Sequence, residues 1–528
     1  MKVTFPVRSA IAAALLAASA LTSPLAMAQT KTKTIRMVPS GDLKTLDPHF
    51  NTAYITRNHG YMVFDMLLAQ DSKGAIKPQM VDKWTSSKDG KKWTFTLRKS
   101  LAFSDDKPVT AADCIASIER WAKKDNLGRA LFAAGAQFTA DSADTFTLTL
   151  KEPFGLVLEA LSKPSGSPLF IYPERIAKTD ISTAVTEMVG SGPFLFVKEE
   201  WVPGNKVVYV KNTKYVPRSE PADGLAGGKV VKVDRVEWLY IPDGNTAAAA
   251  LKNGEVDMIE IVAPDFIPVL EADKSIQLHT SVGAQGMLIP NSLHAPFNNV
   301  KARQALYYLV DQNTYTKALG YPDKYRMKYC ASLYTCNSPT ETSAGAARYQ
   351  KADLEKAKQL MKESGYKGEK VVVLYGTDQA LSPATQVTIQ QLKKIGVNVD
   401  VQSMDWASVA ARRLKKEAPE AGGWSLFHTY GGYFDAGTPL TNPWLSASCG
   451  NSLPGWPCDE ELDKLRSAWL KEVDPAKRKA LADQVQVRGY ETVPYVAWGQ
   501  YFPVHATHGL KNTDAMKSGI PVMWNVEK

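Results

Sequence analysis

One stretch of the chain, Gly422–Cys458, has the composition of a binding pocket. It contains a single charged residue, Asp435, whereas a chain with 22% charged residues would place about eight in a stretch of this length. The stretch is instead rich in glycine and in aromatic residues, which are Trp424, Phe427, Tyr430, Tyr433, Phe434, Trp444 and Trp456. Aromatic walls and one isolated carboxylate suit a small cationic or zwitterionic ligand, because an unpaired buried charge is costly. The alternative is a glycine-rich surface loop in which Asp435 only caps the turn into Ala436-Gly437.

Motifs for catalysis are missing from the sequence. It contains no HExxH, no G-x-S-x-G and no Walker-type glycine loop. Its seven histidines are scattered, and we interpret the i, i+3 spacing of His505 and His508 as accidental, since both follow an extended segment. The sequence therefore predicts no catalytic residue, no metal site and no cofactor.

The N-terminus has the pattern of an export signal. Lys2 and Arg8 supply a positive region, Ile11–Leu21 is apolar, and Ala26-Met27-Ala28 is a small-x-small cleavage site. An uncleaved membrane anchor is the alternative, but the apolar run is short for a bilayer. We therefore expect residues 1–28 to be a cleaved signal peptide and the mature protein to be periplasmic.

Charge and length narrow the class of protein further. The chain of 528 residues is too long for one core and suits two or three domains. Its formal net charge is +9, and the positive residues are dispersed without base-stacking aromatics between them. We therefore expect a solvated basic surface and no nucleic acid partner.

The five cysteines fit an oxidising compartment. Cys330 and Cys336 are close in sequence, as are Cys449 and Cys458, so we expect two short-loop disulfides. Cys114 lies in a helical pattern and is interpreted as a buried free thiol. A zinc site is the alternative interpretation of these cysteines, but the sequence contains no Cys-x2-Cys pair to support it.

A βαβ unit is predicted in the second half of the chain. Val371–Tyr375 and Val397–Val401 read as strands, and Ala384–Ile395 between them reads as a helix that ends at Gly396. Such strands are parallel, and open α/β sheets bind ligands beyond the carboxyl ends of their strands. Trp406 follows the second strand, so it either lines a cleft or packs over the end of the sheet.

Local patterns also predict elements in the first half. Ile35–Val38, Trp93–Leu97 and Phe146–Leu150 read as strands, the second by strict alternation of apolar and polar residues. Tyr61–Leu68 reads as a helix. A further helix begins after Thr110, which is its expected N-cap.

Several blocks of the chain, in order, resemble one protein family. WTFTLRKSLAFSDDKPVTAADCIASIERW, at residues 93–121, is similar to the signature segment of family 5 extracellular solute-binding proteins. TLDPH, GSGPFLFVKEEWVPGNKVVYVKNTKYV, AAALKNGEVDMI and PFNNVKARQALYYLVD resemble further blocks of that family. The resemblance implies an α/β, two-lobed periplasmic binding protein of the large type II class, with an extra subdomain in lobe I.

The resemblance also implies domain boundaries. We expect lobe I to comprise residues 29–287 and 497–528, with its subdomain at about residues 67–193, and lobe II to comprise residues 288–496. The two crossings between the lobes are expected near Gly286–Pro290 and Tyr495–Gln500.

The family resemblance gives Asp435 a role. Peptide-binding members carry an Asp-x-x-(acidic)-Pro segment whose aspartate pairs with the ligand's α-ammonium, and Asp435-Ala436-Gly437-Thr438-Pro439 matches it at the Asp and the Pro. Thr438 replaces the acidic residue, the tryptophan common before the aspartate is absent, and His428 stands where oligopeptide binders have arginine. The expected ligand contacts, beside Asp435, are Trp406, Trp424, His428, Tyr430 and Tyr433, although aromatic residues in such a loop also pack the lobe.

The function implied is capture of a peptide or peptide-like ligand between two lobes and its delivery to an inner-membrane ABC permease. The binding protein itself is expected to be a monomer without enzymatic activity. Relatives in the family also carry nickel chelates, haem, glutathione, opines and oligosaccharides, so the ligand stays open. An exported hydrolase or folding helper on the same scaffold is the alternative of a different class.

Overall fold

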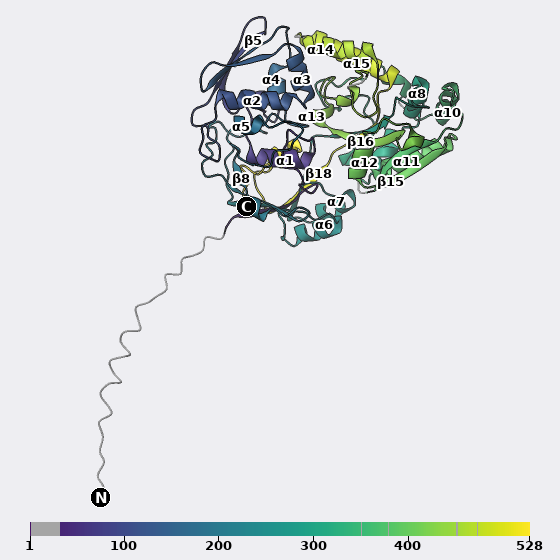
Figure 1. Ribbon diagram of the computed structural model, residues 1–528. Helices are drawn as coiled ribbons and strands as arrows, with labels where there is room; N and C mark the ends of the chain where they lie inside the picture. The colour runs from purple at the N-terminus through teal and green to yellow at the C-terminus, as the bar shows by residue number, and fades with distance from the viewer. Residues whose placement is uncertain (2–31, 350, 378–379, 450–451, 473) are drawn as a thin grey trace.

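The computed structural model describes residue 1 and residues 32–528, apart from 350, 378–379, 450–451 and 473. The expected signal peptide lies outside the described residues, except for Met1. Figure 1 shows two groups of elements side by side, with α1 to α7 in one group and α8 to α15 in the other. We name the group around the seven-stranded sheet the first lobe and the group around the five-stranded sheet the second lobe.

The first lobe is built on a mixed sheet. Its strand order is β12 (Ile276–Thr280), β18 (Val504–His508), β11 (Met258–Ile259), β1 (Thr34–Val38), β10 (Arg235–Leu239), β9 (Lys206–Lys211) and β8 (Phe194–Phe196). The predicted strand at Ile35–Val38 is therefore confirmed as β1, which pairs in parallel with β10 and β11. Helices packed with this sheet include α1 (Tyr54–Val63), α6 (Gly244–Lys252) and α7 (Ile267–Glu271).

The helix predicted at Tyr61–Leu68 is wrong in its position. Helix α1 ends at Val63, and the chain then extends into strand β2 (Leu68–Gln70). Contacts with a distant segment end the helix at Val63. The Gly192 N–H donates to the Val63 carbonyl at 2.9 Å, and a Cβ atom at Gly190 would lie 2.0 Å from that same oxygen. Residues 55–63 are buried all around the helix, so no apolar face marks its register.

A subdomain lies beside this sheet and contains four antiparallel strands. The strand order is β4 (Val81–Ser86), β5 (Lys92–Leu97), β7 (Thr145–Thr149) and β6 (Gln137–Ala140), and a short hairpin joins β2 to β3 (Ile76–Pro78). Its helices are α2 (Ala111–Ala122), α3 (Asn126–Ala133), α4 (Val157–Ser162) and α5 (Glu174–Ala177). The predicted strands at Trp93–Leu97 and Phe146–Leu150 are confirmed, as is the N-cap: Thr110 and Asp113 form a reciprocal capping box.

A buried ion pair ties the chain's opening segment to helix α2. The Arg120 guanidinium, 2% exposed, donates to Asp47 Oδ2 at 2.6 Å. Asp47 also accepts hydrogen bonds from the Tyr172 hydroxyl at 3.0 Å and from the Val185 N–H at 2.9 Å. Burial by itself raises the pKa of Asp47, but the hydrogen bond from Val185 and the charge of Arg120 outweigh it and lower that pKa.

The second lobe contains the predicted βαβ unit. Its sheet has the order β15 (Val399–Met404), β14 (Val371–Gly376), β16 (Leu426–Gly432), β13 (Ala284–Pro290) and β17 (Val496–Tyr501). Strands β14 and β15 are parallel, with Val371 opposite Val399, and α11 (Ser382–Lys394) connects them, which confirms the prediction. The remaining helices are α8 (Val300–Tyr308), α9 (Gln312–Ala318), α10 (Leu354–Glu363), α12 (Trp406–Arg412), α13 (Tyr433–Ala436), α14 (Glu460–Lys471) and α15 (Pro475–Thr492).

The stretch interpreted as a pocket loop begins with a strand instead. Residues Leu426–Gly432 form β16, the middle strand of the second sheet, parallel to β14 and antiparallel to β13. Neither an open pocket loop nor a surface loop describes these residues. The absence of charge from these seven residues follows from their place, because a central strand covered on both faces excludes charged side chains.

The chain changes sheets at two short connections. Residues 281–283 join β12 of the first lobe to β13 of the second, and residues 502–503 join β17 to β18. The boundary expected at 287/288 falls inside β13, and the one expected at 496/497 falls at the start of β17.

The cysteines occupy the environments expected of them. Cys330 is bonded to Cys336, Cys449 is bonded to Cys458, and Cys114 is a buried free thiol in α2.

None of the helices that the structure describes is both long and apolar enough to cross a bilayer.

Candidate ligand-binding site

Asp435 lies where the two lobes meet. It belongs to α13, which directly follows the carboxyl end of β16. Across the boundary, the hydroxyl groups of Tyr54 and Ser165 both donate to Asp435 Oδ2, at 2.5 and 3.1 Å, and Tyr54 in turn accepts the Gly432 N–H at 3.1 Å. The carboxylate is only partly buried, and its Oδ1 has no hydrogen-bond donor among the described residues.

Tyr54 is held in its donor state. Burial raises the pKa of the Tyr54 hydroxyl well above its usual value, and the negative charge of Asp435 raises it further. The hydroxyl therefore stays protonated and donates to the carboxylate, which fixes one oxygen of Asp435 and leaves the other available.

Beside Tyr54 lies a chain of buried polar groups that sequence reasoning missed. The Arg57 guanidinium stands 4.5 Å from the centre of the Tyr54 ring and donates to Ser165 Oγ at 2.7 Å and Asn58 Oδ1 at 2.8 Å. The Asn58 amide donates to Glu260 Oε1 at 2.7 Å, and burial raises the pKa of Glu260. Polar residues inside the buried helix α1 were the available signal, but the wrong register of that helix concealed it.

Tyr430 is the predicted contact that does reach this site. Its ring meets the Tyr54 ring edge-on, with the ring centres 5.9 Å apart. Burial raises the pKa of Tyr430 to about 12, against the opposing effect of the nearby Arg57 charge. Tyr430 therefore lies near the carboxyl end of β16, beside Tyr54 of the first lobe.

Two of the predicted contacts are packed inside the second lobe. Trp424 is fully buried, donates its indole N–H to the Arg413 carbonyl at 3.0 Å and packs against Phe427. His428 is buried as well, and its Nε2 lies 2.9 Å from Thr388 Oγ1 of helix α11. Both side chains are enclosed within the second lobe, and their contact with a ligand stays a prediction.

Tyr433 and Trp406 occupy the edge of the second lobe. The Tyr433 hydroxyl donates to the Asn337 carbonyl at 3.1 Å, and its ring packs edge-on against Phe434. Trp406 begins helix α12 after β15 and borders a small cavity with Leu374 and His428. This position matches the alternative in which Trp406 packs over the end of the sheet.

The burial of His428 gives a testable pH dependence. Burial lowers the pKa of His428 to about 3, whereas an unfolded imidazole has a pKa of about 6.5. The stabilisation from this group is complete above about pH 6.5 and is lost as the pH falls toward 3. Between pH 5.5 and 4, His428 alone should lower the free energy of unfolding by about 1.4 kcal/mol per pH unit.

Urea unfolding at a series of pH values tests this expectation with His428→Gln. The variant should be less stable at neutral pH and should show a shallower decline in acid than the unsubstituted protein. Parallel declines in the two proteins would mean that His428 does not stay neutral in the fold.

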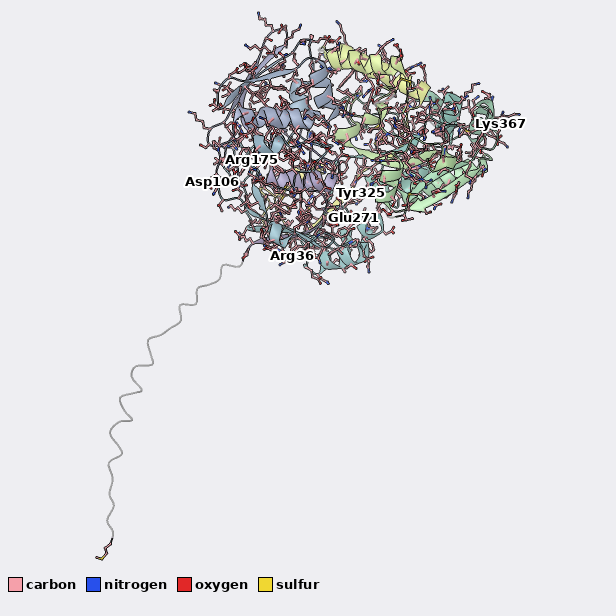
Figure 2. All side chains as sticks on the ribbon, in the orientation of Figure 1. Arg36, Asp106, Arg175, Glu271, Tyr325 and Lys367 are labelled. Atoms are coloured by element: carbon pink, nitrogen blue, oxygen red, sulfur yellow. A yellow bond between two sulfur atoms is a disulfide. The ribbon has the colours of Figure 1, made fainter. Side chains whose placement is uncertain are left out.

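Other contacts close the boundary between the lobes at both ends. Lys471 of α14 pairs with Glu152 at 2.7 Å, and the Arg478 guanidinium of α15 donates to the Gly155 carbonyl at 3.2 Å. At the opposite end, the Tyr325 hydroxyl donates to Glu271 at 3.4 Å, and the two side chains lie close together in Figure 2. The structure therefore has the lobes in contact around the Asp435 site.

No metal centre emerges from the described part of the chain, where no group of three or more histidine, cysteine or acidic side chains could hold an ion. His505 and His508 both lie on β18 and bond to separate backbone carbonyls, those of Glu260 and Leu251. The i, i+3 spacing of the two histidines therefore follows from their places on the strand, where each bonds to a different neighbouring segment.

The fold and this site define a two-lobed α/β binding protein in which polar groups from both lobes converge at their boundary. A family model described as bacterial extracellular solute-binding proteins, family 5 (middle), matches residues 75–452. The chain belongs to this family.

The curated relatives agree with that assignment, and the solved structures share the fold. A probable peptide ABC transporter periplasmic-binding protein from Sinorhizobium fredii is 38% identical, and the match covers 99% of each chain. The glutathione-binding protein of Escherichia coli K12 is 25% identical over 88% of each. Similar folds, each with a TM-score of 0.78, are those of the Helicobacter pylori protein DppA in complex with the peptide STSA and the A. tumefaciens R10 protein AgaA in complex with agropinic acid. DppA is 21% identical in sequence, and the match covers 93% of this chain and 97% of DppA. AgaA is 23% identical, and the match covers 94% of this chain and 98% of AgaA.

Proposed function

We propose that this chain is a periplasmic solute-binding protein that captures a short peptide or peptide-like ligand between its lobes. The observation that carries the proposal is Asp435, a partly exposed carboxylate at the lobe boundary with Oδ1 free of donors from the described residues. An ammonium group is the matching ligand chemistry, because a charge-assisted hydrogen bond to a carboxylate is strong and directional. The Sinorhizobium relative, named for peptide transport, supports the same ligand class.

The proposal includes closure of the lobes about the two connections at residues 281–283 and 502–503. Ligand groups that contact both lobes favour the closed state, since a ligand shifts an equilibrium only by its better contacts in one state. The closed form then delivers its ligand to an inner-membrane ABC permease. A cleaved signal peptide at residues 1–28 would carry the chain to the periplasm, where it acts as a monomer without turning over its ligand.

Native mass spectrometry of protein released gently from the periplasm is the first test. We expect a discrete small mass that is lost on denaturation and whose fragments identify a peptide. A protein purified without ligand would then be titrated with a panel of di- and tripeptides, glutathione and chelated metals by calorimetry. Binding of a metal chelate or a sugar in place of every peptide would contradict the proposal.

Small-angle scattering on the same samples tests the proposed closure. The radius of gyration should fall when a binding peptide is added to the emptied protein and stay constant with a peptide that does not bind. An equal radius in both conditions would contradict a mechanism based on lobe closure.

A further inference from the structure

The loop that the Cys330–Cys336 disulfide closes packs against the helix that carries Asp435. We name residues 330–336 the Cys330 loop; both of its cysteines are buried, although the loop contains neither helix nor strand. Thr335, which is also fully buried, makes the contact. Its backbone N–H donates to the Ala436 carbonyl at 3.1 Å, and its hydroxyl donates to the Tyr433 carbonyl at 3.0 Å. The two residues that accept these bonds are the first and last of α13.

Helix α13 depends on contacts of this kind. It has only four residues, and a helix of that length is not stable by its own hydrogen bonds. The last four carbonyls of any helix need acceptor partners from outside it, and here all four residues belong to that class. Thr335 supplies donors to two of them, and the Thr340 hydroxyl donates to the carbonyl of Gly437, directly after the helix. The direction in which Asp435 leaves the backbone is therefore set by donors from residues 335–340.

Each cysteine of the Cys330 loop is held by one glutamine side chain. Gln312, the first residue of α9, accepts the Cys330 N–H at 2.8 Å and donates to the Cys330 carbonyl at 2.9 Å. Gln500 of β17 accepts the Cys336 N–H at 2.7 Å and donates to the Cys336 carbonyl at 3.1 Å. The disulfide joins these two anchored positions, and Thr335 directly precedes the second. The loop therefore connects α13 firmly to the helix and strand that hold the two cysteines.

We propose that the Cys330 loop positions Asp435 for the ligand's ammonium group, with Thr335 as the positioning residue and the disulfide as the constraint that holds it in place. This inference rests on the proposed function, in which Asp435 is the ammonium anchor. A charge-assisted hydrogen bond depends on direction, and a binding group must be held by its supporting residues to keep that direction. Without the disulfide, the loop would lose conformational entropy each time it adopted the geometry that supports α13.

A merely structural role for the Cys330 loop predicts a different result. If the loop only stabilised the core of the second lobe, its variants would weaken the binding of every ligand by the same factor. An N-acetyl dipeptide lacks the ammonium group that Asp435 would hold, so its affinity is insensitive to the direction of that carboxylate. The ratio of the affinities for a free dipeptide and its N-acetyl form therefore separates positioning from general stabilisation.

The experiment measures this ratio by calorimetry in three variants. Thr335→Val removes the hydroxyl at nearly constant volume and should lower the ratio by about 2- to 10-fold, the factor that corresponds to one neutral hydrogen bond. Thr335→Ser keeps the hydroxyl and should restore most of the ratio. Cys330→Ala combined with Cys336→Ala should lower the ratio at least as much as Thr335→Val. Removing a disulfide can prevent folding, so the two Thr335 variants carry the test if the double variant does not fold.

The second disulfide provides a matched control. Cys449–Cys458 also closes a short loop, but none of the described residues in that loop makes a hydrogen bond to α13. Cys449→Ala combined with Cys458→Ala should therefore leave the affinity ratio unchanged, and circular dichroism checks that each variant folds. An unchanged ratio in folded Thr335→Val would overturn the proposal, as would an equal fall in the ratio in the control variant.

Hydrogen exchange followed by mass spectrometry tests the positioning without any ligand. The segments 333–337 and 432–438 should exchange faster in Thr335→Val and in the Cys330/Cys336 variant than in the unsubstituted protein, and the control variant should match the unsubstituted protein. If the unsubstituted protein bound no dipeptide, the proposed function would fail, and the exchange result would decide the role of the loop by itself. Unchanged exchange in both segments would overturn that role.

Discussion

Asp435→Asn is expected to weaken binding of a free dipeptide by about 10- to 100-fold. The substitution keeps the size and an acceptor oxygen for Tyr54 and Ser165, but it removes the negative charge that the ligand ammonium would meet. A hydrogen bond to a charged group contributes about 1.5 to 3 kcal/mol, and each 1.4 kcal/mol is a tenfold change in affinity. Calorimetric titration of the emptied protein and the variant with one binding dipeptide gives the comparison directly.

Two controls isolate the charge. Asp514→Asn removes an exposed carboxylate paired with Lys517 on the surface and should leave affinity unchanged. The N-acetyl form of the dipeptide, which lacks the ammonium, should bind the unsubstituted protein weakly and should lose little more on Asp435→Asn. If the variant bound the free dipeptide as tightly as the unsubstituted protein, Asp435 would serve only to hold Tyr54 and Ser165 across the lobe boundary.

Arg120→Met is expected to lower the free energy of unfolding of the first lobe by about 3 to 5 kcal/mol. Removing one partner of a buried ion pair leaves the other charge without compensation, here the carboxylate of Asp47, which is fully buried. Methionine fills a similar volume, so lost packing contributes little to the change. Urea unfolding followed by far-ultraviolet circular dichroism measures it.

Arg175→Met is the matched control for that experiment. Arg175 also forms a bidentate pair, with Glu187, but both side chains are about half exposed, and such pairs contribute about 1 kcal/mol or less. A similar loss of stability in the two variants would show that burial does not set the importance of the Asp47–Arg120 pair. If neither variant lost stability, Asp47 would become protonated or hydrated at little cost in free energy.

Local patterns in the sequence were enough for many elements. The alternation at Trp93–Leu97, the Thr110 capping box and the βαβ unit from Val371 to Met404 depend on side chains a few residues apart, and all three are present as expected. The family blocks are of the same kind, because each is a contiguous segment. They allowed the family to be identified before any contact was known.

Burial and distant contacts, in contrast, could not be read from the chain. Gly422–Cys458 was singled out correctly for its low charge, but a central strand and a ligand pocket exclude charge equally, so composition could not separate Trp424 and His428 from Tyr430. Helix α1 was displaced in the prediction because it is buried on all sides, and Arg57 was missed with it.

What the sequence by itself determined is the family, most of the regular elements and Asp435 as the candidate anchor. Only the tertiary structure decided which groups surround that anchor. Tyr54 and Asp435 are 381 residues apart and meet at 2.5 Å, and Arg57 reaches the carbonyl of Gly519, 462 residues away. The physical reason is that a site between two lobes is made of contacts across the fold, and no periodicity within a segment records which distant segment it will meet.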